Sequence, residues 1–348
     1  MPHDGPSPNP AQILAQVGVV AIGRNEGERL KRCLRSISAG AAGLAAVVYV
    51  DSGSTDGSVE FAREQGAEVV ELDMSVPFTA ARARNAGFER LLGLHPELAY
   101  VQFVDGDCAL ASGWLETAAG ALAAQPDVVA VWGRRRELHR DASVYNQLCD
   151  LEWGQAPVGE TLVFGGDVLV RTAAVSAVGG YNAAIIAGED PEFAVRLRRK
   201  TGGRILRLDA EMTLHDADMH RAAQWWKRAK RCGYAYAQVS AIHGAAPERF
   251  WVKERRRALA WGLGVPLAVP LLALPSLGAS SLLLAAYPLR VLKIVQRLQA
   301  EGWAAEDARV WAVNCVAASV PEAVGIVKHA LDRLQGRESR IIEYKRPA

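Results

Sequence analysis

The sequence predicts an α/β fold with a doubly wound, mainly parallel sheet flanked by helices, followed by an apolar helical region. Short apolar runs alternate with segments of helical periodicity from residue 17 onward, which is the pattern of a parallel sheet covered by helices. A long run without charged residues, 258–289, stands outside that alternation. We therefore divide the chain into a flexible leader (1–16), an α/β domain (17–245) and a C-terminal helical region (246–348).

The composition is that of an ordinary globular protein of 348 residues, with 50% hydrophobic and 22% charged residues. The net charge of +2 gives no general attraction to nucleic acid, and we predict no nucleic-acid partner. The five cysteines include no C-x-x-C pair, which argues against a zinc knuckle or a disulfide framework. The leader is rich in proline and lacks the apolar core of a signal peptide.

Short apolar or β-branched runs predict the buried strands, at 17–22, 46–50, 67–72, 100–104, 128–132 and 204–208. The segment after the first strand has apolar residues at helical spacing, and we expect Asn25 to cap that helix. Thr79 is expected to cap a later helix, which carries Arg84.

Acidic side chains stand at or just after the ends of several predicted strands. Glu26 follows the first strand, Asp51 ends the second, and Asp105-Gly106-Asp107 ends the strand at 100–104. In doubly wound sheets, ligands bind beyond the carboxyl ends of the strands, so these carboxylates are expected to share one crevice. Carboxylate oxygens are the ligands that Mg²⁺ and Mn²⁺ prefer. Taken alone, Asp51 fits the role of a turn residue equally well.

Further polar residues follow in the second half of the α/β domain. Gly188-Glu189-Asp190-Pro191 begins a predicted helix, where the helix dipole favours acidic side chains. His215 follows the strand at 204–208 and is a candidate for completing a metal site. A helix from residue 221 carries Lys227 and Arg228. This helix fits either an amphipathic surface helix or a cationic wall facing a diphosphate or lipid headgroups.

Taken together, these stretches resemble the family 2 glycosyltransferases with the GT-A fold. The matching stretches occur in the family's order and cover about residues 17–240; they are Arg24-Asn25-Glu26, Asp51-Ser-Gly-Ser-Thr-Asp56, Ala83-Arg84-Asn85-Ala86-Gly87, Asp105-Gly-Asp107, Gly179-Gly180-Tyr181, Glu189-Asp190 and Gln224-Trp225-Trp226-Lys227-Arg228. The sequence departs from the family at Ser52 and Glu192, where aspartate is frequent. The last stretch only loosely resembles the Gln-x-x-Arg-Trp box of processive synthases, so polymer synthesis is not indicated.

The resemblance implies a binding site for a nucleotide-sugar donor. Glu26 and Asp51 would contact the base and the ribose, with Arg84 nearby. If the helix from residue 221 forms a cationic wall, its Lys227 and Arg228 would face the diphosphate of the donor.

The resemblance also implies a metal site and a catalytic base. Asp105 would lie at the ribose and the metal, and Asp107 would bind Mg²⁺ or Mn²⁺ with His215 as a further ligand. The cation would stabilise the negative charge of the leaving nucleoside diphosphate. Asp190 would deprotonate the acceptor hydroxyl, so that the anomeric carbon inverts by direct displacement.

The predicted function is the inverting transfer of a sugar from a nucleotide-diphospho-sugar, with UDP as the first expectation, to a hydroxyl of a saccharide or lipid-linked acceptor. Such a reaction belongs to the synthesis of cell-envelope or exopolysaccharide glycans or of glycolipids. One alternative is a nucleotidyltransferase, although residues 21–26 poorly match its basic, glycine-rich phosphate loop. Another is a non-catalytic module that binds a sugar nucleotide or a lipid. A dinucleotide oxidoreductase is disfavoured, because no G-x-G-x-x-G follows a strand.

The uncharged run 258–289 predicts an association with a membrane. It is too long for one untilted span of about 20 residues and too short for two spans with a turn, and 274–278 interrupts it. We predict a membrane-associated hairpin or one kinked span at the cytoplasmic face of the inner membrane, since basic residues flank both ends. The alternative is a hairpin buried in a soluble, cytoplasmic protein. A second apolar stretch, 310–327, is the weaker candidate.

Overall fold

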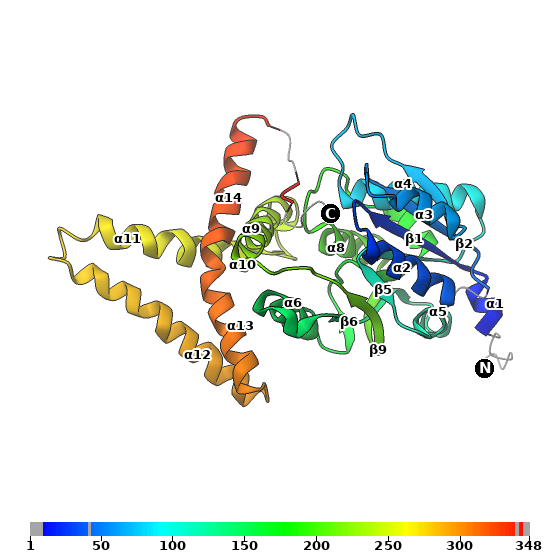
Figure 1. The fold of residues 1–348 in the computed structure, drawn as a ribbon. Helices are drawn as coiled ribbons and strands as arrows, with labels where there is room; N and C mark the ends of the chain where they lie inside the picture. Colours follow the sequence, from blue (N-terminus) through cyan, green and yellow to red (C-terminus); the bar gives the residue numbers. More distant parts are fainter. Residues whose placement is uncertain (1–9, 41–42, 338–340, 344–348) are drawn as a thin grey trace.

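The computed structural model describes residues 10–40, 43–337 and 341–343. It consists of an α/β body and a helical C-terminal region, from which one pair of helices projects (Figure 1). Most of the predicted leader lies outside the described residues. Its last part is not a flexible segment, because Pro10–Leu14 forms helix α1 and the Leu14 side chain is buried in the core of the body.

One nine-stranded sheet forms the centre of the body, in the order β3-β2-β1-β4-β8-β6-β9-β5, with β7 paired to β9. The first four strands along this order are parallel; they are β3 (Glu68–Glu71), β2 (Ala46–Asp51), β1 (Val17–Gly23) and β4 (Tyr100–Asp105). The rest of the sheet is mixed, and it contains β8 (Val168–Arg171), β6 (Val128–Glu137), β9 (Arg204–His215), β5 (Cys108–Leu110) and β7 (Gly159–Thr161).

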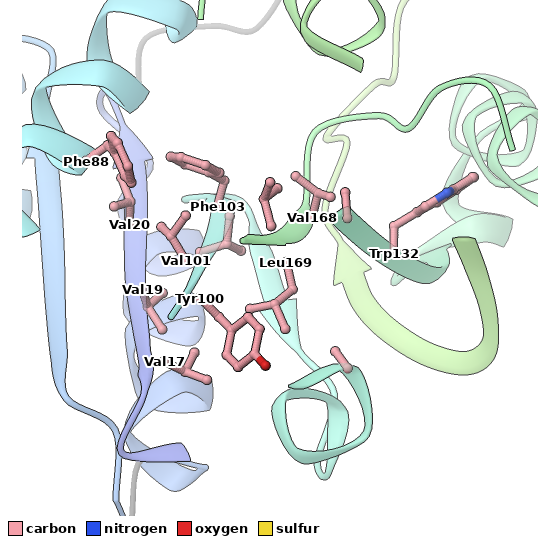
Figure 2. Close-up of a cluster of buried hydrophobic side chains, with 14 of the residues drawn as sticks. Val17, Val19, Val20, Phe88, Tyr100, Val101, Phe103, Trp132, Val168 and Leu169 are labelled. Atoms are coloured by element: carbon pink, nitrogen blue, oxygen red, sulfur yellow. The ribbon is translucent and has the colours of Figure 1, made fainter. Parts of the chain in front are cut away.

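The central strands are largely apolar, as expected for strands that helices cover. Their side chains form a single buried core with the helices (Figure 2). The covering helices of the body are α2 (Glu28–Ala39), α3 (Ser58–Glu64), α4 (Ala80–Leu94), α5 (Trp114–Ala124), α6 (Val144–Gly154), α7 (Thr172–Val178) and α8 (Glu189–Thr201), with a short 3₁₀ turn at Arg140–Ala142.

Two predicted helix caps have different outcomes. Thr79 caps α4 as predicted, because its hydroxyl accepts a hydrogen bond from the Arg82 amide at 3.1 Å. Asn25 does not cap α2, which begins after Gly27. Asn25 instead adopts a left-handed φ of 51°, and its side chain accepts a hydrogen bond from the Thr55 amide. The residue therefore ties the loop after β1 to the loop after β2.

Helix α9 (Ala222–His243), a long helix on the side of the body, ends just before the C-terminal region. The chain then continues through α10 (Val252–Leu259), a π-helical turn (Ala260–Gly264), α11 (Val265–Leu271), a 3₁₀ segment (Ala279–Ala285), α12 (Ala286–Ala300), α13 (Ala305–Ala317) and α14 (Ser319–Leu334). Helix α14 crosses α9 at close range. A Cβ atom added to Gly233 would lie 1.9 Å from the Glu322 carbonyl oxygen, so glycine is required at that crossing.

The uncharged run folds as a hairpin that leaves the body along α11 and returns along α12 (Figure 1). The chain turns between these helices, as the predicted break at 274–278 requires. The hairpin is not buried against the described part of the chain, because the leucines of the turn are exposed; Leu277, for example, is 96% exposed. Among the described residues, one helical stretch, Ala305–Leu334, is long and apolar enough to cross a membrane, and half of its most apolar window is buried in the protein.

Candidate active site

A cavity of about 500 Å³ lies beyond the carboxyl ends of β1 and β4. Its position is the one expected for ligands of an α/β sheet. Most of the predicted site residues line it: Glu26, Arg84, Asp105, Asp107, Asp190, His215 and Arg228. The sheet thus brings together residues that are separated by more than half of the chain.

The pairing of strands places His215 beside Asp107. His215 ends β9 and pairs with Cys108 of β5 on one side and with Glu137 of β6 on the other. Its Nε2 lies 3.3 Å from Asp107 Oδ2, and its Nδ1 lies 3.4 Å from Glu137 Oε2. All three side chains are buried. Glu137 therefore fixes the orientation of the imidazole ring, a role that the sequence did not reveal.

This arrangement has the chemistry of a cation site. Burial lowers the pKa of His215, which favours the neutral ring. With the proton on Nδ1 facing Glu137, the Nε2 lone pair points at the carboxylate of Asp107, and two acceptors then face each other. A divalent cation held by the Asp107 carboxylate and the His215 imidazole would satisfy both acceptors. The residues present thus fit a bound cation.

The neighbouring Cys108 is unsuited to this role. Its Sγ lies within 4.8 Å of the ligand atoms of Asp107 and His215. Burial raises the pKa of its thiol well above the usual range, so the sulfur keeps its proton. Hard cations also prefer oxygen to sulfur.

Asp105 faces arginines rather than the other metal candidates. Its Oδ1 accepts a hydrogen bond from Arg84 Nη2 at 2.8 Å, and its Oδ2 lies 3.5 Å from Arg135 Nη2. Its backbone amide donates to Asp167, which is fully buried and paired with Arg135. The oxygen of Asp105 therefore groups with Asp167 and not with Asp107 and His215. The Asp105 carboxylate, which the sequence predicted at the ribose and the metal, is held by Arg84 and Arg135 in this structure.

Arg84 connects the aspartate turn of β4 with the start of α8. Its side chain is buried, and Nη1 lies 3.0 Å from Glu189 Oε1 and 3.3 Å from Asp190 Oδ1. The guanidinium also stacks over the ring of Tyr181, at 5.2 Å from its centroid. The single buried charge of Arg84 thus lies beside three carboxylates and must compensate their negative charge.

Asp190 lies in the first turn of α8, two residues after the left-handed Gly188. Its Oδ2 accepts a hydrogen bond from the Gly166 amide at 2.9 Å. Burial, together with the charge of Glu189, raises the pKa of Asp190 to about 7, although Arg84 opposes that rise. A carboxylate with this pKa can accept a proton near neutral pH, as a general base must.

Of the two carboxylates predicted to contact the donor nucleoside, Glu26 lines the cavity and Asp51 does not. Glu26 lines the cavity and pairs with Arg29, whose Nε lies 2.9 Å from its Oε2. Asp51 is buried beneath the loop, where its carboxylate accepts hydrogen bonds from the amides of Gly53 and Ser54, both at 2.8 Å. Ser52, and not Asp51, is among the residues that line the cavity. The carboxylate of Asp51 thus shapes the loop.

Helix α9 contributes the basic wall of the cavity. Arg228 and Arg231 line the cavity, and Arg228 Nη1 lies 2.8 Å from Glu152 Oε2. The prediction of Lys227 as a donor-binding residue is not supported, because its side chain is exposed and does not line the cavity. Successive residues of a helix point about 100° apart, so Lys227 and Arg228 cannot face the same site. Arg231, three residues after Arg228, shares its face.

Comparisons with known proteins agree with this architecture. Residues 19–161 match the model of glycosyl transferase family 2. Glycosyltransferase AglE of Haloferax volcanii is 31% identical over 105 residues, which are 29% of this chain and 33% of that protein. The match therefore spans about a third of the length of that curated relative.

Solved structures are similar over most of the chain. The mannosyltransferase PcManGT from Pyrobaculum calidifontis, in complex with GDP-Man and Mn²⁺, has a TM-score of 0.61 at 22% identity and covers 90% of this chain and 87% of its own. Residues 1–349 of TarS from S. aureus have a TM-score of 0.51 at 15% identity, with 92% of both chains covered. Glucosyl-3-phosphoglycerate synthase from Mycobacterium tuberculosis, with phosphoglyceric acid, has a TM-score of 0.51 at 17% identity and covers 69% of this chain and 86% of its own.

The sheet, the position of the cavity and the family match define the class of this protein: it has the GT-A fold of nucleotide-sugar transferases. The predicted fold class is confirmed. Within this fold, residues 19–161 match glycosyl transferase family 2, in agreement with the resemblance of the motifs.

Proposed function

We propose that this glycosyltransferase moves a sugar, with inversion, from a nucleotide-diphospho-sugar to a hydroxyl of a saccharide or lipid-linked acceptor, with help from a divalent cation. The observation that carries the proposal is the meeting of Asp107 and His215 at one end of the cavity that Asp190 also lines. A metal-bound diphosphate and an acceptor can then occupy one pocket. A UDP-sugar is the first donor to test, and Mg²⁺ and Mn²⁺ are both candidates for the cation.

The donor diphosphate would lie between the metal ligands and the basic wall. Asp107 and His215 would hold the cation, which would neutralise charge on the leaving nucleoside diphosphate. Arg228 and Arg231 add positive charge from α9. Such preorganised charge acts most strongly where negative charge develops in the transition state. Glu26 would contact the nucleoside.

The acceptor hydroxyl would give its proton to Asp190. The hydroxyl oxygen then attacks the anomeric carbon from the face opposite the leaving diphosphate, and the configuration inverts. The hydrogen bond from the Gly166 amide and the contact with Arg84 fix the carboxylate in place. A fixed base of suitable pKa accelerates a reaction by about 10²–10⁴-fold.

We assign residues 17–245 to the transferase domain and 246–348 to a membrane-associated region. In this proposal the enzyme works at the cytoplasmic face of the inner membrane, in the synthesis of envelope glycans or glycolipids. The uncharged run and its basic flanks support this placement. Trp251, which lines the cavity, directly precedes α10, so the transferase site and the membrane-associated region are contiguous.

Thermal unfolding with nucleoside diphosphates tests the donor site. UDP or GDP with Mn²⁺ should stabilise the protein, because a ligand at about 100 times its Kd adds about 2.7 kcal/mol to the free energy of unfolding. Asp107→Asn and His215→Gln should remove the part that depends on Mn²⁺. Asp141→Asn, at an exposed side chain, is the matched control. Equal stabilisation with and without the metal in all four proteins would contradict the proposal.

A further inference from the structure

The hairpin of α11 and α12, with the turn between them, carries an exposed apolar surface at its far end. We call residues 263–292 the arm. It projects away from the α/β body, and its turn lies far from the sheet (Figure 1). Leu271, Leu274, Leu277 and Leu282 are 74%, 89%, 96% and 74% exposed. In water, such a continuous leucine surface is unfavourable, and on a soluble protein it marks a contact with a membrane or a partner.

The serine hydroxyls of the turn find their hydrogen-bond acceptors within the arm itself. The hydroxyls of Ser276, Ser280 and Ser281 donate to the carbonyl oxygens of Leu272, Val269 and Gly278. The arm has no charged side chain between Leu263 and Leu289. Inside a bilayer every polar group must find its partner within the protein, whereas a water-exposed turn has no such requirement. The turn is therefore already suited to hydrocarbon.

The root of the arm has the features of a membrane interface. Trp261 and Tyr287 pack against each other with ring centroids 5.7 Å apart, and Arg290 stacks over Trp261. Aromatic side chains of this kind concentrate at the boundary between hydrocarbon and water. Just after the arm, α12 carries the exposed basic residues Lys293 and Arg297. Each basic residue near an anionic surface contributes about 1 kcal/mol of attraction.

The first helical limb of the arm is about as long as one leaflet of hydrocarbon is thick, and too short to cross a whole bilayer. Residues 263–271 form about two and a half helical turns, or about 13 Å at 1.5 Å per residue. One leaflet of hydrocarbon is about 15 Å thick, half of the usual 30 Å. The helix cannot contribute more length on the body side, because Gly262 packs against α14; a Cβ atom there would lie 1.8 Å from the Ser319 carbonyl oxygen.

We propose that the arm inserts into one leaflet of an anionic bilayer and anchors the enzyme without spanning the membrane. The leucines of the turn enter the hydrocarbon, Trp261 and Tyr287 lie at its boundary, and Lys293 and Arg297 contact lipid phosphates. This inference rests on the proposed membrane localisation and gives it a physical mechanism. It does not depend on the proposed transfer reaction. A second copy of the chain could cover the leucines. It would not explain why aromatic and then basic side chains follow the apolar ones along the hairpin, as they do at a membrane surface.

Vesicle flotation of the full chain tests the proposal. The protein should float with vesicles that contain phosphatidylglycerol and bind phosphatidylcholine vesicles more weakly. The double variant Leu274→Asp/Leu277→Asp should bind about a hundredfold less well or worse, because each leucine loses its transfer into hydrocarbon. Leu334→Asp is the matched control, since Leu334 is 83% exposed but lies at the end of α14, outside the arm. It should float like the unmodified protein.

A second measurement separates one-leaflet insertion from spanning. Ser276→Cys places a thiol in the turn, and vesicles are loaded with a membrane-impermeant maleimide before the protein is added outside. We expect no labelling from the inside; labelling would show that the arm crosses the bilayer and would overturn the proposal. The proposal also fails if the unmodified protein binds neither vesicle, or if it is a dimer that the double variant converts to a monomer. Stabilisation of the double variant by nucleotide and Mn²⁺ reports separately on the donor site.

Discussion

Removal of the Arg84 guanidinium should move the pH dependence of turnover, because this side chain opposes the rise in the pKa of Asp190. The variant Arg84→Met keeps the bulk of the side chain in a buried position and removes its charge. With Arg84 present, the pKa of Asp190 is about 7. A cation at this distance lowers a carboxyl pKa by about 1–3 units, so its loss should raise the Asp190 pKa by that amount.

The size of the effect on rate follows from the ionised fraction of the base. At about pH 7.5, a rise of about 1–3 units in the pKa lowers the ionised fraction of Asp190 by about threefold to about two-hundredfold. The loss should disappear as the pH rises above the new pKa. A general base must be deprotonated to act, so turnover increases with pH on the acid limb. In the variant this limb is displaced to higher pH.

The assay is the initial rate of transfer at saturating donor, from about pH 6 to about pH 10, with kcat separated from KM. Arg82→Met is the matched control, since Arg82 lies on the same helix but binds the exposed loop carbonyls of Asp73 and Val76. Arg84→Lys retains the charge and should shift the acid limb less than Arg84→Met. If Arg84→Met lowers kcat equally at every pH, Arg84 does not act through the proton affinity of Asp190 and the reasoning is refuted.

Two further predictions concern the base and the packing of α4. Asp190→Asn should lower turnover by about 10²–10⁴-fold and abolish the acid limb near pH 7, while binding of the nucleotide persists in a thermal-shift assay; loss of nucleotide binding would make Asp190 a donor ligand instead. Gly87→Ala should destabilise the protein by about 1–3 kcal/mol, because its Cβ would lie 2.3 Å from Val20 Cγ1. Gly93→Ala, on the same helix but facing open space, should be neutral or stabilise by up to about 1 kcal/mol in urea unfolding; a similar loss in both would exclude packing as the cause.

The sequence by itself determined the fold class and the position of the site. The apolar runs around Val17 and Tyr100 are too short and too uniformly apolar for surface helices, and they form the parallel strands at the centre of the sheet. Because parallel strands present their carboxyl ends at one edge, acidic residues placed there could be assigned to one crevice. Both inferences depend only on the order of residues within short segments, and the sequence shows that order directly.

The tertiary structure alone decided which side chains meet. Glu137 orients His215 only because β6 and β9 pair in one particular register, and a shift of one residue would turn either side chain to the other face of the sheet. In the same way, Arg84 forms an ion pair with Asp105, while Asp107 lies beside His215.

The C-terminal region shows the same division between pattern and packing. The uncharged run was plain from the sequence, but a hairpin buried in a core and a hairpin exposed at the protein surface can have the same composition. The structure separated them through Gly233 and Gly262, which let α14 pack closely on α9 and on the root of the arm, so that the leucines around Leu277 remain outside. Close packing between distant segments depends on their three-dimensional fit, and no local pattern in the sequence contains that fit.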